Sequence, residues 1–340
     1  MVSVEADHLV ISGYGNTGIT SDARALQKDG ANRGATSPAG SVTVTANTLE
    51  LHDFGKISSN TDTVGKAGSV TIRADRLLIL GSGGERAEER EYTGITTNAR
   101  TGSTGAAGDV TVQTGELELR KGGVISSNTL GPGQAGTVSI RAGNLIISSE
   151  TDGTKIFTGI SSVTGGSGNA GVINVRAGNL SASGEPSTPN VVTAGIVTDA
   201  LATSSGDAGE IVVDADKLTL RGAGVIRSAT WASGDAGTVS VRSDELLVSG
   251  GAFFATGIMS DADFSSSTGV AATGKAGRVV VEARELSISD GGVIRSDTWG
   301  PGNAGPVSVR ADHLLISDLN NTGITSDARR TNASDPFWSF

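Results

Sequence analysis

The sequence predicts an all-β chain folded as a right-handed, single-stranded parallel β-helix, a solenoid of three sheets and about ten coils. Two observations predict it. The dipeptide Ala-Gly recurs at intervals of 28 to 40 residues, at positions 39, 67, 107, 135, 170, 208, 236, 276 and 304. Residues 2–24 and 307–329 are identical at 18 of 23 positions, although their starts lie 305 residues apart. Self-similarity of this kind is typical of repeat architectures.

Each repeat contains three short strand-like phrases with period-two alternation, which buries one face of a strand and leaves the other in water. The first phrase is V-x-V-x-A, the second is L-x-I, and the third is G-x-I-x-[ST]-x-[TA] or its [TA]-G-I variant. Examples are Val138, Ile140 and Ala142 for the first phrase, Leu117 and Leu119 for the second, and Ile57 for the third. No window shows a convincing helical period, so helix should be nearly absent.

A three-stranded unit of 28 residues cannot bury its apolar face alone, whereas stacking like strands of successive units buries it around a narrow core. Right-handedness follows from the preferred hand of parallel crossovers. We expect one domain over 1–340, with coils starting near 1, 39, 67, 107, 135, 170, 208, 236, 276 and 304 and an irregular tail at 330–340. A β-sandwich is the rival fold, but its strands would lack this fixed phrase. The first coil begins inside its first strand without a polar cap, so we expect a segment of a longer rod.

Composition bounds the possible functions. The chain has 50 glycines and 4% aromatic residues, poor material for a compact core of large side chains, while a mean hydropathy of −0.04 is too apolar for a disordered chain. A net charge of −10 argues against nucleic acid or an anionic membrane as partner. Cysteine is absent, which excludes disulfides and thiolate metal sites. Neither a membrane-spanning apolar run nor a signal peptide is visible.

The phrases "GSGNAGVINVRAGNLSASG", "GPGQAGTVSIRAGNLIIS" and "GGVISSNT" resemble the filamentous haemagglutinin-type exoproteins of two-partner secretion systems, above all the large cyanobacterial versions. The resemblance covers essentially the whole chain. It implies a β-helical rod that is exported through an outer-membrane partner pore and works as a secreted or cell-surface adhesin, without catalysis or cofactor. The secretion domain and signal sequence of that family are not seen in this chain.

Several sequence patterns could indicate a metal or catalytic site, but a structural role explains each of them better. The Gly-rich joints lack the tandem nine-residue spacing of calcium-binding repeats, and lysine, which cannot ligate calcium, occupies one joint position at Lys66 and Lys275. The three histidines, His8, His52 and His313, are too dispersed for a metal cluster or a Ser-His pair. An outward column of the first phrase alternates in charge from Asp214 through Arg242, Glu282 and Arg310, which we interpret as a device for register.

A carboxylate column forms the alternative, enzymatic hypothesis. The position three after the isoleucine of the third phrase is expected to face solvent, and it holds Asp261, Asp297 and Asp327 in three consecutive coils about 4.8 Å apart. Two carboxylates at such a separation suit sugar hydrolysis, so the alternative function is a β-helix polysaccharide lyase or glycoside hydrolase acting on acidic glycans. The same column holds Asn, Val and Ala in other coils, which favours a tolerant polar ladder.

The candidate binding residues lie where the repeat is interrupted. Insertions around 80–93, 148–158, 183–193 and 249–256 occupy one place in the repeat, so they should emerge along one edge of the rod, where solenoids usually bind partners. Tyr92, Phe157, Phe253 and Phe254 are their aromatic anchors, and Trp231 and Trp299 share another repeat position. The expected partner is a glycan or protein of a host or neighbouring cell surface. An ice-binding rod is a third possibility, but the outward positions are too mixed for a flat threonine array.

Overall fold

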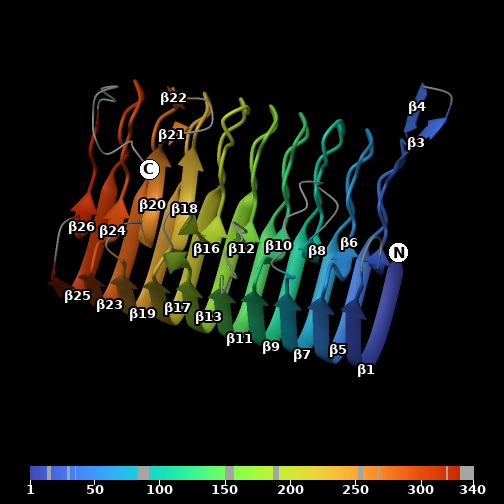
Figure 1. The fold of residues 1–340 in the computed structure, drawn as a ribbon, viewed down its shortest axis with the longest axis horizontal. Coiled ribbons are helices and arrows are strands. Elements are labelled where there is room, and N and C mark those ends of the chain that lie inside the picture. The colour runs from blue at the N-terminus through green and yellow to red at the C-terminus, as the bar shows by residue number, and fades with distance from the viewer. Residues whose placement is uncertain are drawn as a thin grey trace.

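The computed structural model confirms an all-β parallel β-helix (Figure 1). It describes residues 1–340 except 14–16, 29–30, 35, 83–91, 150–156, 187–190, 252–255, 266–268, 319–320 and 330–340. Two ten-stranded sheets run the length of the rod, and every strand in them pairs in parallel with the corresponding strands of the adjacent coils. Within the described ranges there is no helical segment with the length and apolar character needed to cross a bilayer.

One sheet consists of long strands and the other of short strands. The long strands are β1 (Val2–Ser12), β5 (Val42–His52), β7 (Val70–Leu80), β9 (Val110–Arg120), β11 (Val138–Ser148), β13 (Val172–Ser183), β17 (Glu210–Arg221), β19 (Val239–Ser249), β23 (Val279–Ser289) and β25 (Val307–Ile316). The short strands are β2 (Gly18–Thr20), β6 (Lys56–Ser58), β8 (Thr93–Thr96), β10 (Gly123–Ser126), β12 (Thr158–Ser161), β16 (Ala194–Val197), β18 (Gly224–Thr230), β20 (Thr256–Ala262), β24 (Gly292–Arg295) and β26 (Gly323–Thr325).

Three small antiparallel hairpins lie outside these sheets. They are formed by β3 (Ala25–Lys28) with β4 (Ala31–Gly34), β14 (Glu185–Pro186) with β15 (Val191–Val192), and β21 (Phe264–Ser265) with β22 (Val270–Ala271). The first and third hairpins follow a short strand, whereas the second connects a long strand to a short one. Interruptions of the repeat therefore leave the rod at two different corners.

The first two sequence phrases form one strand instead of two, so the three predicted sheets appear as two. In β5, Val42, Val44 and Ala46 point inward, and the next inward residues are Leu49 and Leu51. The spacing of three between Ala46 and Leu49 reverses the parity, so the strand bends at this point and lines two sides of the coil. The short strands follow the long ones along each coil. Just after them, a one-residue ladder links Ala or Thr of successive coils, such as Thr129, Thr164 and Ala200.

The apolar residues of all three phrases form one continuous core. The pairs Leu117 with Leu119 and Val138 with Ile140 are buried, as is Ile57, which confirms the inward directions expected from the alternation. Corresponding residues are register partners, so like side chains stack along the rod; Leu145, for example, lies between Leu117 and Leu180. Each buried Leu, Ile or Val stabilises the fold by about 1.5–3 kcal/mol relative to exposure.

The glycine of the Ala-Gly dipeptide is required because adjacent coils leave no room for a β-carbon there. A β-carbon on Gly209 would overlap the carbonyl oxygen of Gly171 in the preceding coil, and one on Gly237 would overlap that of Gly209. A buried serine joins these glycines across the coil. The Ser228 hydroxyl donates to the Gly209 carbonyl (2.9 Å) and accepts from the Gly237 N–H (2.8 Å). Ser127, Ser260 and Ser296 make the same pair of bonds in other coils.

Replacing a glycine of this joint should be costly. We expect Gly209→Ala to lower the free energy of unfolding by about 1–3 kcal/mol, because its methyl group meets backbone that has little room to move. Gly165→Ala is the matched control, since its nearest neighbours are the methyl groups of Leu130 and Leu201, which can rotate away. Urea titrations followed by circular dichroism measure both. Equal losses in the two variants would contradict the role given to the Ala-Gly joint.

Candidate functional site

The carboxylate column belongs to a ladder of Asn and Asp side chains, here called the Asx ladder, at one position of each coil. It consists of Asp22, Asn60, Asn98, Asn128, Asp199, Asp261, Asp297 and Asp327, with Val163 and Ala229 as gaps. Each side-chain oxygen accepts the backbone N–H at the same position of the next coil. Representative distances are 2.8 Å from Asn128 N to Asn98 Oδ1 and 3.0 Å from Asp297 N to Asp261 Oδ1. The ladder therefore satisfies backbone groups that the short strands leave unpaired.

Each ladder side chain also lies beside the residue two positions before the ladder position in the next coil. The type of that residue depends on the ladder residue. The side-chain oxygen of an asparagine accepts a hydrogen bond from a hydroxyl group: Asn60 accepts from Thr96 (2.9 Å) and Asn98 from Ser126 (3.1 Å). The gaps are followed by apolar residues at the same place: Val163 by Val197, and Ala229 by Met259. Val197 and Met259 belong to a small buried cluster with Val225 and Val293. Acceptor and donor are thus present together or absent together.

Two of the aspartates are matched by an arginine instead. Arg227 binds Asp199 through Nε (3.2 Å) and Nη2 (2.6 Å), and Arg295 binds Asp261 through Nε (2.8 Å) and Nη2 (2.7 Å). Burial raises the pKa of Asp261, although Arg295 opposes that effect. Burial disfavours the charged form of Arg295, but the carboxylates around it, Asp261 first among them, together outweigh this effect and raise its pKa. Because Asp261 is buried and bound by Arg295, removal of either partner alone should be costly.

The expectation that this column faces solvent is wrong for most of its members. Asp261 and Asp297 are buried, and Asp327, in the last coil, is exposed. Alternation does not place the side chain at this position: Asp261 lies inside β20, all of whose residues are buried, whereas β24 ends at Arg295, before Asp297. In both coils the Asx side chain turns along the rod to bond the next coil. The oxygens of Asp261 and Asp297 are engaged by backbone N–H groups, Arg295 and Thr325, which is a structural arrangement.

Trp231 and Trp299 cover arginines of this same region. The Arg227 guanidinium carbon lies 4.9 Å from the centre of the Trp231 ring, and that of Arg329 lies 4.9 Å from the Trp299 ring. Arg329 also binds Asp297 (3.3 Å) and Asp327 (3.2 Å). Both tryptophans are half-buried. Each ring therefore has a face in a cation–π contact that is part of the rod's own packing.

The aromatic residues of the insertions are placed only in part. The Tyr92 hydroxyl contacts Thr96 Oγ1 (2.6 Å) and accepts from Asn60 Nδ2 (3.2 Å), and the buried Lys56 lies over its ring at 5.5 Å. Phe157 packs against the cluster that contains Val197. Phe253 and Phe254 lie outside the described residues. Tyr92 and Phe157 therefore anchor the ends of their insertions to the rod.

Each of the three histidines lies beside a glutamate, and two of them share Glu50. His8 and His313 belong to the first and last coils, where they approach Glu50 (3.4 Å) and Glu285 (3.9 Å). His52 binds Glu50 at 2.9 Å, and this hydrogen bond lowers the pKa of Glu50. The part of the chain that the structure describes holds no group of three or more His, Asp or Glu suited to a metal ion.

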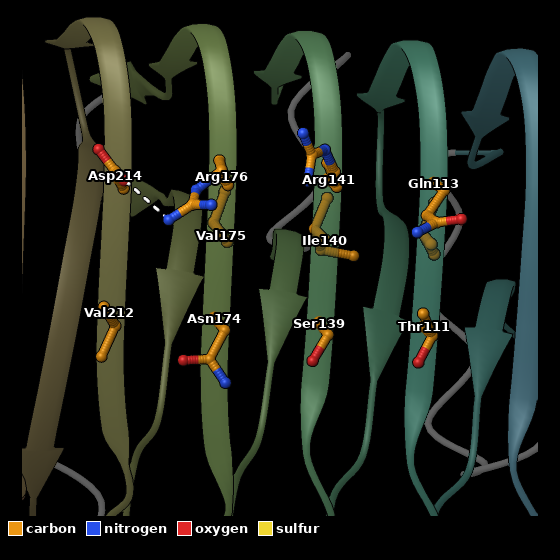
Figure 2. Close-up of a pocket in the computed structure, with 11 residues that line it drawn as sticks. Thr111, Gln113, Ser139, Ile140, Arg141, Asn174, Val175, Arg176, Val212 and Asp214 are labelled. Atoms are coloured by element: carbon orange, nitrogen blue, oxygen red, sulfur yellow. Dashed lines mark ion pairs between the residues drawn. The ribbon is translucent and has the colours of Figure 1, made fainter.

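A shallow groove on the outer face of the long-strand sheet is a feature that the sequence did not single out. It crosses β9, β11, β13 and β17 in the half of each strand before the bend. Figure 2 shows two parallel rows of side chains along it. One row is Gln113, Arg141, Arg176 and Asp214, and the other is Thr111, Ser139, Asn174 and Val212. The first row continues, toward the N-terminus, the column whose alternating charges from Asp214 onward were interpreted from sequence as a device for register.

Comparison with known proteins gives no matching family model, no matching curated protein and no matching solved structure.

The pairing within the Asx ladder can be tested by exchange. Asp261→Asn keeps an oxygen for the Asp297 N–H but leaves the largely buried Arg295 unpaired, so it should cost about 3–5 kcal/mol in the free energy of unfolding. Adding Arg295→Ser recreates the Asn98–Ser126 arrangement, and most of the loss should be recovered. Denaturant titrations of both single variants and the double variant measure the coupling. Additive losses without recovery would contradict the matching rule.

The charge of Asp297 should make stability depend on pH. Burial raises the pKa of this carboxyl above its unfolded value, so the folded protein binds a proton more readily and stability falls as pH rises through the folded pKa. Asp297→Asn removes this penalty and keeps the ladder oxygen. The variant should be more stable than the wild type at neutral pH, and its advantage should shrink as pH falls. Thermal unfolding of both proteins from pH 7 to pH 4 tests this, and an advantage that is constant with pH would contradict it.

Proposed function

We propose that the chain is a structural and adhesive rod segment of a secreted or cell-surface exoprotein of the filamentous haemagglutinin type. The stacked coils serve as a rigid spacer, and binding takes place at the insertions along one edge. Its parent would leave the cell through an outer-membrane pore. The partner is a glycan or protein of a host or neighbouring cell surface. The repeat phrases that resemble this family support the proposal together with the confirmed β-helix.

The observation that carries the proposal is that the four insertions start and end at the same positions of the coil. They leave long strands at Leu80, Ser148, Ser183 and Ser249, and these positions stand in one register column through Arg120 and Arg221. They return at the first residues of β8, β12, β16 and β20, which also share a column with Gly123 and Gly224. Since both flanks are aligned, the insertions start and end along a single edge of the rod.

The geometry of the Asx ladder favours this proposal over the enzymatic alternative. Sugar hydrolysis needs two carboxyl groups that reach the scissile bond. Asp261 and Asp297 direct their oxygens at backbone and arginine within the rod, so their chemistry is structural. The insertions, in contrast, differ from one another in length and sequence, which lets a partner distinguish positions along an otherwise repetitive surface.

Shortening the insertions tests the proposed function. Replacing all four by the two-residue Lys121-Gly122 turn that connects β9 and β10 should leave the circular dichroism spectrum unchanged and abolish binding to the cell surfaces that the wild type recognises. The matched control shortens the β21–β22 hairpin at the other corner and should bind normally. If binding survives the fourfold shortening and also Trp231→Ala with Trp299→Ala, the segment is a passive spacer and the adhesive part of the proposal fails.

A further inference from the structure

The groove on the long-strand sheet coincides with a run of arginines that breaks the charge alternation of its column. From Arg73 the column continues through Gln113, Arg141 and Arg176 before the first carboxylate, Asp214. Farther along the rod, in contrast, each arginine of this column stands beside a carboxylate. Cationic groups are therefore concentrated over β7 to β13, at the groove.

Arg141 and Arg176 are direct register partners in adjacent parallel strands. Like charges in such positions destabilise a sheet. Arg176 binds Asp214 at 3.2 Å on its far side, and both groups are well exposed. Among the described residues, no carboxylate forms an ion pair with Arg73 or Arg141. An anion lying between Arg141 and Arg176 would offset their repulsion and supply an acceptor to the guanidinium group of Arg141.

The neighbouring rows complete a surface suited to a polymer with alternating anionic and hydroxyl groups. The bend position beside the arginines is glycine in three consecutive coils, Gly115, Gly143 and Gly178, whereas the flanking coils carry Asp75 and Asp216 there. Along this side the three glycines leave the backbone uncovered, and the nearest carboxylates are those of Glu116 and Asp216 at its ends. On the other side lies the row of Thr111, Ser139 and Asn174, whose hydroxyl and amide groups donate and accept hydrogen bonds.

We infer that this groove binds a linear acidic glycan, which lies along the rod axis with its carboxylate or sulfate groups at Arg141 and Arg176 and its hydroxyl groups on the Thr111–Asn174 row. Successive coils are about 4.8 Å apart, close to the length of one sugar unit in an extended chain. A chain of such units therefore advances by about one unit per coil and meets one residue of each row at every coil. The glycines give it access to the arginines.

The chemistry of the lining favours a glycan over nucleic acid. Single-stranded nucleic acid is held by aromatic rings on which its bases stack. None of the side chains that line the groove is aromatic. A glycan also carries ring hydroxyl groups on its units, and these match the hydrogen-bonding side chains of the Thr111–Asn174 row. The groove lies before the bend of the long strands and the insertions follow their ends, so this site stands independently of the proposed adhesive edge.

Paired substitutions test the site. Binding of the full chain to polygalacturonate, heparin, dextran and single-stranded DNA is measured by calorimetry at low salt. Arg141→Gln with Arg176→Gln should weaken binding to the acidic glycans at least tenfold. Arg242→Gln with Arg310→Gln is the control, because it removes the same charge from the same column where carboxylates flank the arginines. The control should bind as the wild type, and dextran should bind to none of the proteins.

The outcomes are distinct. Selective loss in the Arg141 and Arg176 variant supports the site, and comparison of polygalacturonate with heparin tells whether carboxylate or sulfate is preferred. Binding of neither glycan by the wild type overturns the inference, as does equal weakening in both double variants. DNA binding that depends on Arg141 and Arg176 and matches the glycans in affinity would overturn the choice of a glycan. Shortening the insertions should leave glycan binding in the groove unchanged, which separates this test from that of the adhesive edge.

Discussion

The fold depends on one constraint: each position of a coil must complement the same position of the next coil at the spacing of paired strands. The constraint is visible at the Ala-Gly joint, where glycine leaves room for the carbonyl oxygen of the corresponding glycine in the preceding coil. A buried hydroxyl such as Ser228 then connects two successive joints and fixes the height of each coil. The straight core, the two sheets and the common edge of the insertions all follow from this repeated fit (Figure 1).

The same constraint makes neighbouring coils interdependent in their side chains. At the Asx ladder, an oxygen in one coil requires a donor in the next, and a gap such as Val163 is followed by the apolar Val197. Burial makes this matching strict, since an unpaired polar group inside the rod costs more than the net gain from one hydrogen bond. The Arg295–Asp261 pair is the charged form of a rule that Ser126 and Asn98 satisfy without charge. Stability is therefore a property of pairs of coils.

Sequence periodicity was sufficient for the repeat, the parallel pairing and the inward faces, because those depend on local alternation that each coil repeats. It failed at the Asx ladder. Asp261 and Asp297 were expected in solvent from the alternation, but their side chains turn along the rod and bond the next coil. The bend after Ala46 likewise merged two predicted strands into one. The groove could not be predicted from the sequence because it depends on three columns of the long-strand sheet that lie side by side, one with arginines, one with glycines and one with hydroxyl groups.

A repetitive rod can be specific only where it departs from repetition. Columns in which charges alternate, or in which identical apolar side chains stack, stabilise the observed strand register, and this role is sufficient to explain them. Arg141 opposite Arg176 disfavours register, and it occurs beside three glycines that replace the acidic bend residues of the flanking coils. Two departures at one place, one electrostatic and one steric, are difficult to derive from stacking alone. They follow together if this stretch of the sheet accommodates an anionic chain, while the insertions differentiate a separate edge of the same rod.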